Sequence, residues 1–369
     1  MRTIAHWIDG KLYEGTPIGR FAVENPGTGE VEAELLQASD ADLDHVVEVA
    51  RRAQKEWAKV SLAKRTAIMF RMRQLVLDHS DEMATMIVAE HGKNYSDAIG
   101  EIQRGRETLD FATAINLALK GEHSFDISTG VDIHTLRQPV GVVAGICPFN
   151  FPAMVPMWMH PVALATGNAF ILKVASVVPS ASLIIARLYK EAGLPDGLFN
   201  VIAGDRHLVT DILTHPGIDA ISFVGSTPVA HIVQDTGVAH GKRVQALGGA
   251  NNHAIVMPDA DIEFAAQHIS AGAFGEYEVT VCFVRVSALR VGPNEHVPHP
   301  GGAGFWFLGR GVGLEGAFVE YVAAAVGYRM VDEEALFEEL AVVGEVHAEE
   351  FRVAAGAGES DSGDDAYHV

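Results

Sequence analysis

The segment VGVVAGICPFNFP, residues 140–152, carries the clearest structural signal in this sequence. Its first eight residues are small or β-branched, a composition typical of a strand buried on both faces. We expect this strand to end near the first proline. Residues 153–166 form an apolar run, interrupted by His160, that predicts a buried helix. A Gly-Asn pair separates it from a second expected strand, AFILK at residues 169–173. The segment therefore predicts a βαβ unit.

Two polar residues lie at the ends of these expected strands. Asn150 follows the first strand and Lys173 ends the second. In open α/β sheets, ligands bind beyond the carboxyl ends of the strands. An amide there can donate to a developing oxyanion, and a lysine can reach a ribose hydroxyl or a phosphate. The alternatives are that Asn150 caps the following helix and that Lys173 is a solvated strand end.

The order of strand and helix repeats after this unit. We expect a helix at 179–191, a strand at 199–203, a helix at 205–214 and a strand at 218–224. Such alternation predicts an α/β fold with a parallel sheet and helices on both faces. Gly225 and Ser226 follow the last strand, where the start of the next helix offers free amides to a phosphate. A Gly-Ser-Thr helix start is common, so alone it does not specify a ligand.

The first part of the chain predicts hairpins and amphipathic helices. Turn residues near Gly10 and in NPGTG at 25–29 indicate short hairpins, and residues 121–136 indicate a further one. Helical periodicity predicts helices at 40–55, 63–79, 81–90 and 101–119. Arg104 lies in the last of these helices. From the sequence alone, its simplest role is a surface ion pair with Glu101 or Glu107.

Composition limits the class of protein. The 369 residues include 48 acidic and 27 basic side chains, a net charge of −21, which argues against a nucleic-acid partner but not against a small anionic cofactor. The two cysteines cannot form a disulfide framework, and the N-terminus lacks the pattern of a secretory leader. We therefore expect a cytoplasmic protein. We expect no membrane association, because no apolar run reaches the roughly 18 to 20 residues of a spanning helix.

Several short motifs together resemble one family. PFNFP (148–152), AFILK (169–173), AGLPDGLFN (192–200) and FVGST (223–227) occur in the order and spacing of the aldehyde dehydrogenase superfamily. GKRVQALGG (241–249), NH (252–253) and MPDAD (257–261) narrow the resemblance to the methylmalonate-semialdehyde (malonate-semialdehyde) dehydrogenases, the CoA-acylating branch. The resemblance covers about residues 6–275. The remainder diverges from the family, or the family's C-terminal part is truncated.

This resemblance implies a fold and an activity. The expected fold has a parallel Rossmann-like NAD-binding sheet from residues 1–120 and 138–249, a protruding oligomerisation hairpin at 121–137, and an incomplete catalytic α/β domain at 250–353. The implied reaction is NAD-dependent oxidation of methylmalonate semialdehyde or malonate semialdehyde through a cysteine thioester. The acyl group is then transferred to CoA and, after decarboxylation, gives propionyl-CoA or acetyl-CoA. The family suggests a homodimer or homotetramer, although its C-terminal oligomerisation strand is missing here.

The resemblance also implies roles for single residues. Asn150 is the expected oxyanion donor. Arg104 is the expected partner of the substrate's carboxylate, a role that suits the planar fork of a guanidinium. The fold binds NAD without the usual glycine fingerprint. The cofactor-binding residues implied for this chain are Phe149, Lys173, Gly204, Gly225 and Ser226.

Of the two cysteines, Cys282 is the candidate nucleophile of the implied mechanism. Its spacing to the Val-Gly pair at 291–292 matches that of the family's catalytic cysteine. The residues before it depart from the family, and Val281 stands where an arginine is usual. The alternative is that Cys282 is a strand residue, because free cysteines are often buried. We expect Cys147, at the end of a buried strand, to be a core residue.

One substitution favours acyl transfer to CoA over hydrolysis. Many hydrolytic aldehyde dehydrogenases have a glutamate ahead of Leu-Gly-Gly, where this chain has Ala246. Without that general base, water is poorly activated. The thioester should therefore persist until the CoA thiol takes the acyl group.

The last third of the chain leaves other hypotheses open. No family landmark follows Pro293, and we expect residues 354–369 to be disordered. The glycines at 311–316 fit a dinucleotide motif, but no complete βαβ unit follows them. His296 and His299 lack further ligands, so we assign no metal. The alternatives are a catalytically impaired relative that only binds a nucleotide or a homologous subunit, and an unrelated Rossmann enzyme using those glycines.

Overall fold

The computed structural model describes residues 2–249, 252–256, 259–261, 263–266, 268 and 284–288. The described residues divide into two compact units, one holding residues 2–249 and the other holding the residues from 252 onward. Cys282 lies outside the described residues, as do His296, His299, the glycines at 311–316 and the segment 354–369. All the other predicted site residues belong to the first unit.

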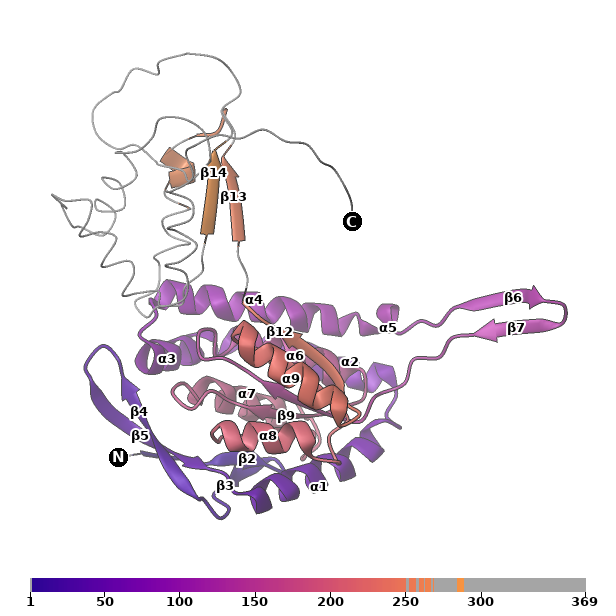
Figure 1. Ribbon diagram of the computed structural model, residues 1–369, viewed down its shortest axis with the longest axis horizontal. Helices are drawn as coiled ribbons and strands as arrows, with labels where there is room; N and C mark the ends of the chain where they lie inside the picture. The colour runs from indigo at the N-terminus through magenta and orange to yellow at the C-terminus, as the bar shows by residue number, and fades with distance from the viewer. Residues whose placement is uncertain are drawn as a thin grey trace, which may run out of the picture. The chain divides into compact units, whose positions relative to one another are not determined.

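A seven-stranded sheet runs through the first unit (Figure 1). Its strands, in spatial order, are β12 (Arg243–Leu247), β11 (Ala220–Val224), β8 (Val142–Ile146), β9 (Ala169–Lys173), β10 (Phe199–Ile202), β2 (His6–Ile8) and β3 (Lys11–Tyr13). The first five are parallel to one another, and β2 and β3 extend the sheet as an antiparallel hairpin. The predicted parallel α/β sheet is therefore confirmed.

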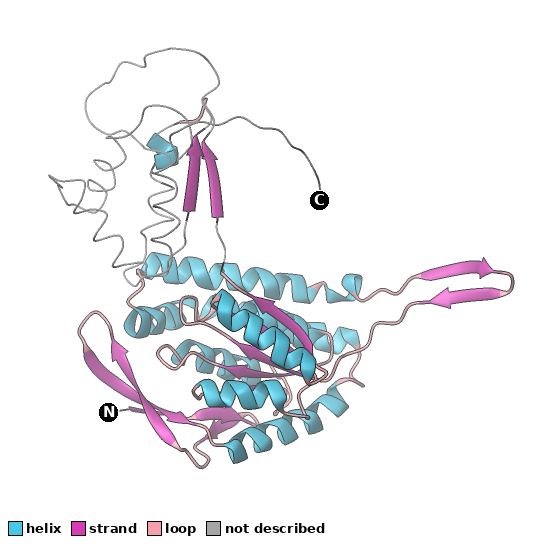
Figure 2. Ribbon diagram, in the orientation of Figure 1, coloured by secondary structure: helices cyan, strands magenta, loops and turns pink. Residues whose placement is uncertain are grey.

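The connecting helices cover both faces of this sheet (Figure 2). The crossovers between β8, β9 and β10 are α6 (Met154–Ala165) and α7 (Ser180–Glu191). Those between β10, β11 and β12 are α8 (Arg206–Thr214) and α9 (Thr227–Ala239). Since βαβ crossovers are right-handed and the chain reverses its direction across the sheet between these pairs, the pairs cover opposite faces.

The remaining helices form further layers. Helix α1 (Asp40–Trp57) packs on β8, β9 and β10 and against α8. Helices α2 (Leu62–Asp78), α3 (Ser80–His91) and α4 (Tyr95–Thr113) pack on α6 and α7, and a short α5 (Ile115–Ala118) follows. Within the described part of the chain, no helix combines the length and apolar character needed to cross a bilayer.

The predicted bounds of α4 were wrong. The sequence indicated a helix over 101–119, but α4 begins at Tyr95 and the chain leaves helical geometry at Ala114. Gly100 weakens the local helical signal, because glycine is a poor helix former. Packing against α6 compensates for this in the folded chain.

The parallel strands are buried on both faces, as their uninterrupted apolar sequences predicted. In β9, the side chains from Ala169 to Leu172 are 0% exposed. His160, the polar residue of α6, also lies in this core, and its Nδ1 is 2.8 Å from the hydroxyl of Tyr189. Burial lowers the pKa of His160 to about 3, so the ring is neutral there.

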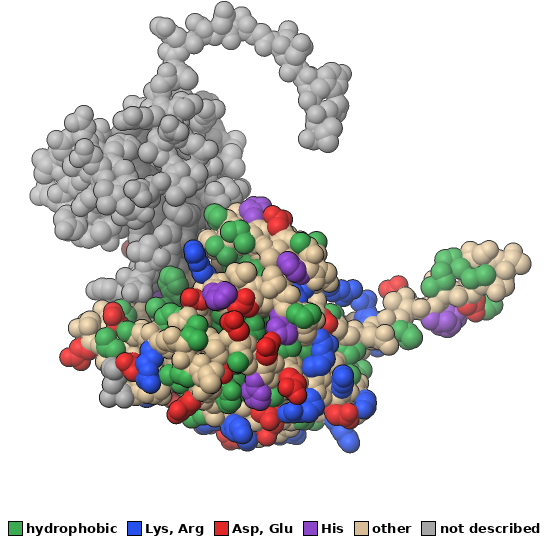
Figure 3. All heavy atoms as spheres, turned by 60° about the horizontal axis from the view of Figure 1, so that its bottom comes forward, with side chains coloured by type: hydrophobic (Ala, Val, Ile, Leu, Met, Phe, Trp, Pro, Cys, Tyr) green, Lys and Arg blue, Asp and Glu red, His purple; other side chains and the backbone are tan. Residues whose placement is uncertain are grey.

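Smaller sheets also occur among the described residues, and one of them contributes Ile4, Val23 and Leu35 to the hydrophobic core. Strands β1 (Arg2–Ile4), β5 (Glu30–Gln37) and β4 (Gly19–Asn25) form one of them, in that order. Strands β6 (His123–Ser128) and β7 (Val131–His134) form the predicted protruding hairpin, clearly visible in Figure 1. In the second unit, β13 (Asn252–Val256) pairs in parallel with β14 (Val284–Ala288). On the face drawn in Figure 3, acidic, basic and histidine side chains are interspersed.

Candidate functional site

The carboxyl ends of the parallel strands meet along one edge of the sheet. Ile146 of β8 is in register with Lys173 of β9 and with Phe223 of β11, and Val224 is in register with Leu247 of β12. The chain runs from β8 outward to β9 and β10 and then returns to β11 on the other side of β8. Sheets with this reversal bind ligands at the strand ends beside it. The segments that follow β8 and β11 are therefore neighbours at the edge where a ligand is expected.

Asn150 lies in the segment between β8 and α6, and its side chain does not cap that helix. The N-cap position of α6 is Ala153, and no capping bond comes from that residue's own side chain. The Oδ1 of Asn150 is buried and accepts no hydrogen bond from the residues that the structure describes. The helix-capping alternative is therefore wrong.

Glu101 of α4 bonds the first amides of α6 instead. Its Oε1 accepts hydrogen bonds from the backbone nitrogens of Ala153, at 2.7 Å, and Met154, at 3.0 Å. Its Oε2 lies 2.9 Å from the Nζ of Lys93, and neither side chain is exposed. The same Nζ donates to the backbone oxygen of Asn150 at 2.9 Å. Burial raises the pKa of Glu101 above its ordinary value, and the ammonium and the two amides oppose this incompletely.

Lys173 is a half-buried cation at the same edge. Its Nζ makes no hydrogen bond or salt bridge within the described residues. Burial lowers the pKa of Lys173, while the nearby Cys147 and Asp205 raise it. Lys173 is therefore less exposed than the solvated strand end of the alternative interpretation.

Cys147 is a core residue, as predicted. Its side chain is 7% exposed, and its Sγ lies 3.7 Å from the Sδ of Met159. Burial raises the pKa of the Cys147 thiol far above its usual range, although Lys173 has the opposite effect. Since the thiolate is the nucleophilic form, Cys147 is unsuited to attack an aldehyde.

Gly204 and Gly225 occupy places where a side chain would collide with its neighbours. A Cβ on Gly204 would lie 2.5 Å from the side chain of Leu208, and one on Gly225 would lie 2.4 Å from the ring of Phe223. Both glycines follow strands of the parallel sheet. They let the backbone pass closely over α8 and over the end of β11.

The start of α9 offers backbone amides at this edge. Ser226 is its N-cap residue, but the serine side chain makes no capping bond, and Pro228 lies in the first turn. The Oγ1 of Thr227 accepts a hydrogen bond from the amide of Gly249 at 3.0 Å, which ties this turn to the segment after β12. A helix start with uncapped amides is suited to an anionic group such as a phosphate.

Arg104 lies on α4. It is exposed and forms no ion pair with any described residue, because Glu101 is bonded to Lys93 instead. The predicted alternative of a pair with Glu101 is therefore wrong. The adjacent Gly105 brings α4 against α6, since a Cβ there would lie 2.3 Å from the Cε of Met157. Arg104 is one helical turn beyond Glu101, on a helix packed against α6.

Sequence comparison identifies the family. A profile described as "Aldehyde dehydrogenase family" matches residues 13–282. The chain belongs to the aldehyde dehydrogenase family. It is 46% identical over 275 residues to malonate-semialdehyde dehydrogenase 1 of Geobacillus thermodenitrificans (strain NG80-2) and 45% identical over 292 residues to malonate-semialdehyde dehydrogenase of Pseudomonas aeruginosa. These alignments cover 74% and 79% of this chain but 57% of each relative. The chain thus spans little more than half the length of these relatives.

Solved aldehyde dehydrogenases share the fold. One is a protein described as a methylmalonate-semialdehyde dehydrogenase from Sinorhizobium meliloti 1021, in complex with NAD, and another is the methylmalonate-semialdehyde dehydrogenase of Oceanimonas doudoroffii. Each matches with a TM-score of 0.72 and 46% identity, covering 74% of this chain and 56% of the solved chain. The expected aldehyde-dehydrogenase-like fold is confirmed for that part of the chain.

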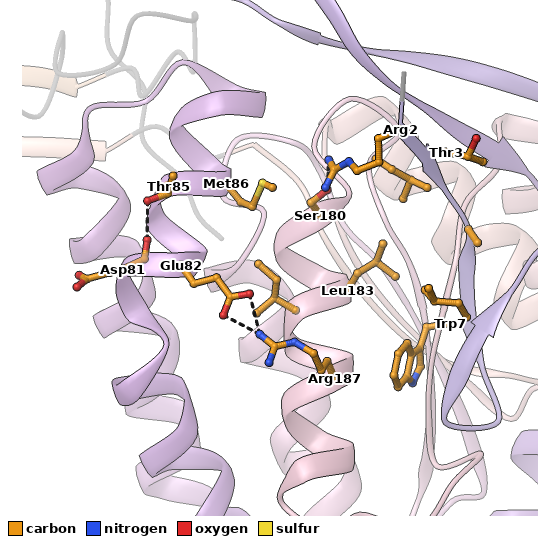
Figure 4. Close-up of a pocket in the computed structure, with 14 residues that line it drawn as sticks. Arg2, Thr3, Trp7, Asp81, Glu82, Thr85, Met86, Ser180, Leu183 and Arg187 are labelled. Carbon is orange, nitrogen blue, oxygen red and sulfur yellow. Dashed lines mark hydrogen bonds and ion pairs between the residues drawn. The ribbon is translucent and has the colours of Figure 1, made fainter.

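A pocket of about 650 Å³ occurs elsewhere in this aldehyde dehydrogenase unit, beside β1, α3 and α7 (Figure 4). Its charged rim is already paired: the guanidinium of Arg187 lies 2.7 Å from both carboxylate oxygens of Glu82, and that of Arg2 lies 3.1 Å from Glu90. None of the predicted site residues lines it. Pocket size alone does not identify a site, and the groups at the sheet edge that lack partners among the described residues are the better indicator.

A group of possible metal ligands is present on the surface. Asp40, His207 and Asp211 have ligand atoms within 4.8 Å of one another. Asp40 and His207 are exposed, and His207 lies 3.6 Å from Asp211, as in an ordinary ion pair. We assign no metal to this group.

Sequence reasoning missed Lys93 and Glu101 as parts of the site. The two residues are eight positions apart and belong to no motif that the chain displays. Lysine and glutamate are usually exposed, so their types gave no reason to expect burial. The contact between Glu101 and Ala153 joins residues 52 positions apart, and only folding brings them together.

Proposed function

We propose that this chain is an NAD-dependent, CoA-acylating semialdehyde dehydrogenase acting on malonate semialdehyde or methylmalonate semialdehyde. The observation that carries the proposal is the side chain of Asn150. It lies after β8 at the reversal of the sheet. It does not cap α6, because the first amide groups of that helix bond to Glu101 instead. The names of the relatives support the substrate class.

The residues at the sheet edge fit NAD. In the proposal, the ammonium of Lys173 and the amides at the start of α9, including Ser226, bind the cofactor's hydroxyl and phosphate oxygens. Gly204 and Gly225 allow close approach, and Phe149, 43% exposed, offers apolar surface. When bound, NAD supplies an acceptor for the hydride of the substrate.

Each of several side chains would then have a separate role in the reaction of the aldehyde. The thiolate of Cys282 is the proposed nucleophile, which adds to the carbonyl carbon and later carries the acyl group as a thioester. The amide of Asn150 donates to the oxygen on which negative charge develops. The exposed guanidinium of Arg104 pairs with the carboxylate of the semialdehyde. Ala246 cannot activate water, so the thiol of CoA is the proposed acyl acceptor.

The proposal includes a cytoplasmic location and assembly as a homodimer or homotetramer. The absence of a disulfide framework in the sequence supports the first. Exposed apolar side chains on the hairpin of β6 and β7 support the second. No nucleic-acid or membrane partner is proposed.

A catalytically impaired relative that binds only a nucleotide or a homologous subunit is the second candidate. The observation that favours it is the length of the match, which covers 57% of each curated relative. In this case the NAD-binding residues would operate without turnover.

Two measurements separate these candidates. We expect calorimetry to show saturable NAD binding, and we expect reduction of NAD with malonate semialdehyde to require CoA. Asn150→Ala should lower kcat by about 100-fold or more while leaving NAD affinity unchanged, because an oxyanion donor acts in the transition state. Cys282→Ala should abolish turnover. NAD binding without turnover in the unmodified chain would select the second candidate, and equal rates with and without CoA would refute acyl transfer.

A further inference from the structure

Lys93 and Glu101 form an ion pair that is completely removed from solvent. The Nζ and Oε2 are 2.9 Å apart, and both side chains have 0% exposure. Lys93 follows α3 after Gly92, whose φ of 77° turns the chain away from that helix, and Glu101 lies within α4. The pair therefore belongs to the helical layer, not to the sheet that carries Asn150.

Each partner also bonds the segment between β8 and α6. Lys93 donates to the backbone oxygen of Asn150 at 2.9 Å, and its Nζ lies 4.0 Å from the ring centre of Phe151. Glu101 accepts from the amides of Ala153 and Met154. The pair thus forms hydrogen bonds with the backbone at both ends of the segment 150–154.

Stability alone is a poor explanation for this arrangement. Removing two charges from water commonly costs more than their attraction returns, unless further hydrogen bonds complete the pair. Here three further hydrogen bonds of the pair end on the segment 150–154. At least part of the energetic compensation for burying the charges is therefore obtained at the segment that carries the candidate oxyanion donor.

We propose that Lys93 and Glu101 are positioning residues for Asn150. Lys93 fixes the backbone of Asn150, and Glu101 satisfies the start of α6, so the side-chain amide of Asn150 needs no helix-capping role. The catalytic meaning of this inference rests on the proposed function, in which that amide binds the oxyanion.

The chain offers a matched control for this proposal. Glu90 is also a buried carboxylate, with 4% exposure, and pairs with Arg2 at 3.1 Å. It bonds the start of a different helix, accepting from the amide of Ser180 of α7 at 3.0 Å. Loss of Glu90 should perturb α7 but not the segment 150–154.

Hydrogen exchange of the full chain, resolved by mass spectrometry, tests the positioning directly. The variants are Lys93→Met, Glu101→Met, the double variant that removes both buried charges, and Glu90→Met. In Glu101→Met and the double variant, we expect the amides of Ala153 and Met154 to exchange at least about tenfold faster, as for loss of a charge-assisted hydrogen bond. Lys93→Met should accelerate exchange across the same segment. Glu90→Met should affect Ser180 and leave residues 150–154 unchanged.

Kinetics supply a readout that a general loss of stability would not produce. If the unmodified chain is active, Lys93→Met and Glu101→Met should each lower kcat by about tenfold or more. The KM for the aldehyde and the Kd for NAD should stay within about twofold of the values for the unmodified chain. Glu90→Met should retain kcat.

The outcomes separate the two proposals. Unchanged exchange at Ala153 and Met154, or equal acceleration there in Glu90→Met, overturns the positioning role whether or not the chain is active. If exchange accelerates in the Lys93 and Glu101 variants but the unmodified chain shows no turnover, the positioning of Asn150 is supported and the enzymatic proposal is refuted. Accelerated exchange with unaltered kcat overturns the positioning role in catalysis.

Discussion

Cys147 and Lys173 are neighbours at the ends of adjacent strands, and burial affects them in opposite directions. Burial raises the pKa of the thiol and lowers the pKa of the ammonium, and each group favours the charged form of the other. The first effect makes Cys147 inert. Lys173 stays a candidate cation for a ribose or phosphate group, since the nearby Cys147 and Asp205 oppose the effect of burial on its pKa.

Cys147 should resist alkylation in the folded protein, because both its burial and its raised pKa suppress the thiolate. We expect iodoacetamide to modify Cys147 at least about 100-fold more slowly than the thiol of Val177→Cys, whose parent side chain is 51% exposed. Peptide-resolved mass spectrometry measures both rates, and denaturant should equalise them. Comparable rates in the folded chain would show that Cys147 is accessible.

His160 should make the protein sensitive to acid. Burial lowers the pKa of His160 to about 3 from 6.5, so below pH 6.5 the unfolded chain binds a proton that the folded chain does not. The free energy of unfolding should therefore fall as the pH drops through this window, by at most roughly 1.4 kcal/mol per pH unit for this group. In His160→Gln, the free energy of unfolding, measured by urea denaturation, should decrease less steeply between pH 7 and pH 5 than in the unmodified chain. His231→Gln, an exposed control on α9, should keep the original slope, and an identical slope in His160→Gln would contradict the assignment.

At the level of elements, the contact between α4 and α6 organises the site. Glu101 reaches the start of α6 from α4, and Gly105 lets the two helices approach one turn later. Arg104 lies between these two residues in sequence and remains exposed. The helix that positions the candidate oxyanion donor therefore also carries the candidate carboxylate partner.

Gly105→Ala should destabilise the protein. The new Cβ would lie 2.3 Å from the Cε of Met157 and 3.2 Å from the backbone Cα of Met154, and the backbone cannot move aside as a side chain can. We expect a loss of about 1–3 kcal/mol in the free energy of unfolding. Gly100→Ala is the control on the same helix, with no atom within 4 Å of its new Cβ, and should gain about 0.5–1 kcal/mol from helix propensity. Urea denaturation measures both, and equal shifts would argue against close packing at Gly105.

On the scale of the whole molecule, the hairpin of β6 and β7 should mediate self-association. Phe125 and Ile127 are 78% and 58% exposed, which is unusual for large apolar side chains unless a partner covers them. We expect the protein to sediment as a dimer or tetramer in analytical ultracentrifugation, and we expect the double variant Phe125→Ser, Ile127→Ser to shift towards the monomer. Ser124→Ala, on the same strand, should retain the assembly. A monomeric parent chain would contradict this prediction.

Much of the first unit was predictable from local patterns. The uninterrupted apolar run of β9 and the alternation of strands and helices predicted the parallel sheet, because strands covered on both faces carry apolar residues throughout. The turn residues predicted the hairpins. The start of α4 was missed because Gly100 masks a helix that tertiary packing stabilises.

The sequence by itself determined the family, the order of elements and the side chains available at the strand ends, since these depend on motifs and on the spacing of apolar residues. Tertiary structure decided which of those side chains have partners within the part of the chain that the structure describes. Asn150 could have capped α6 and Arg104 could have paired with Glu101, but Glu101 bonds α6 and Lys93 instead. The physical reason is that buried charges must find partners, and here those partners come from segments about 50 residues away that meet only in the folded chain.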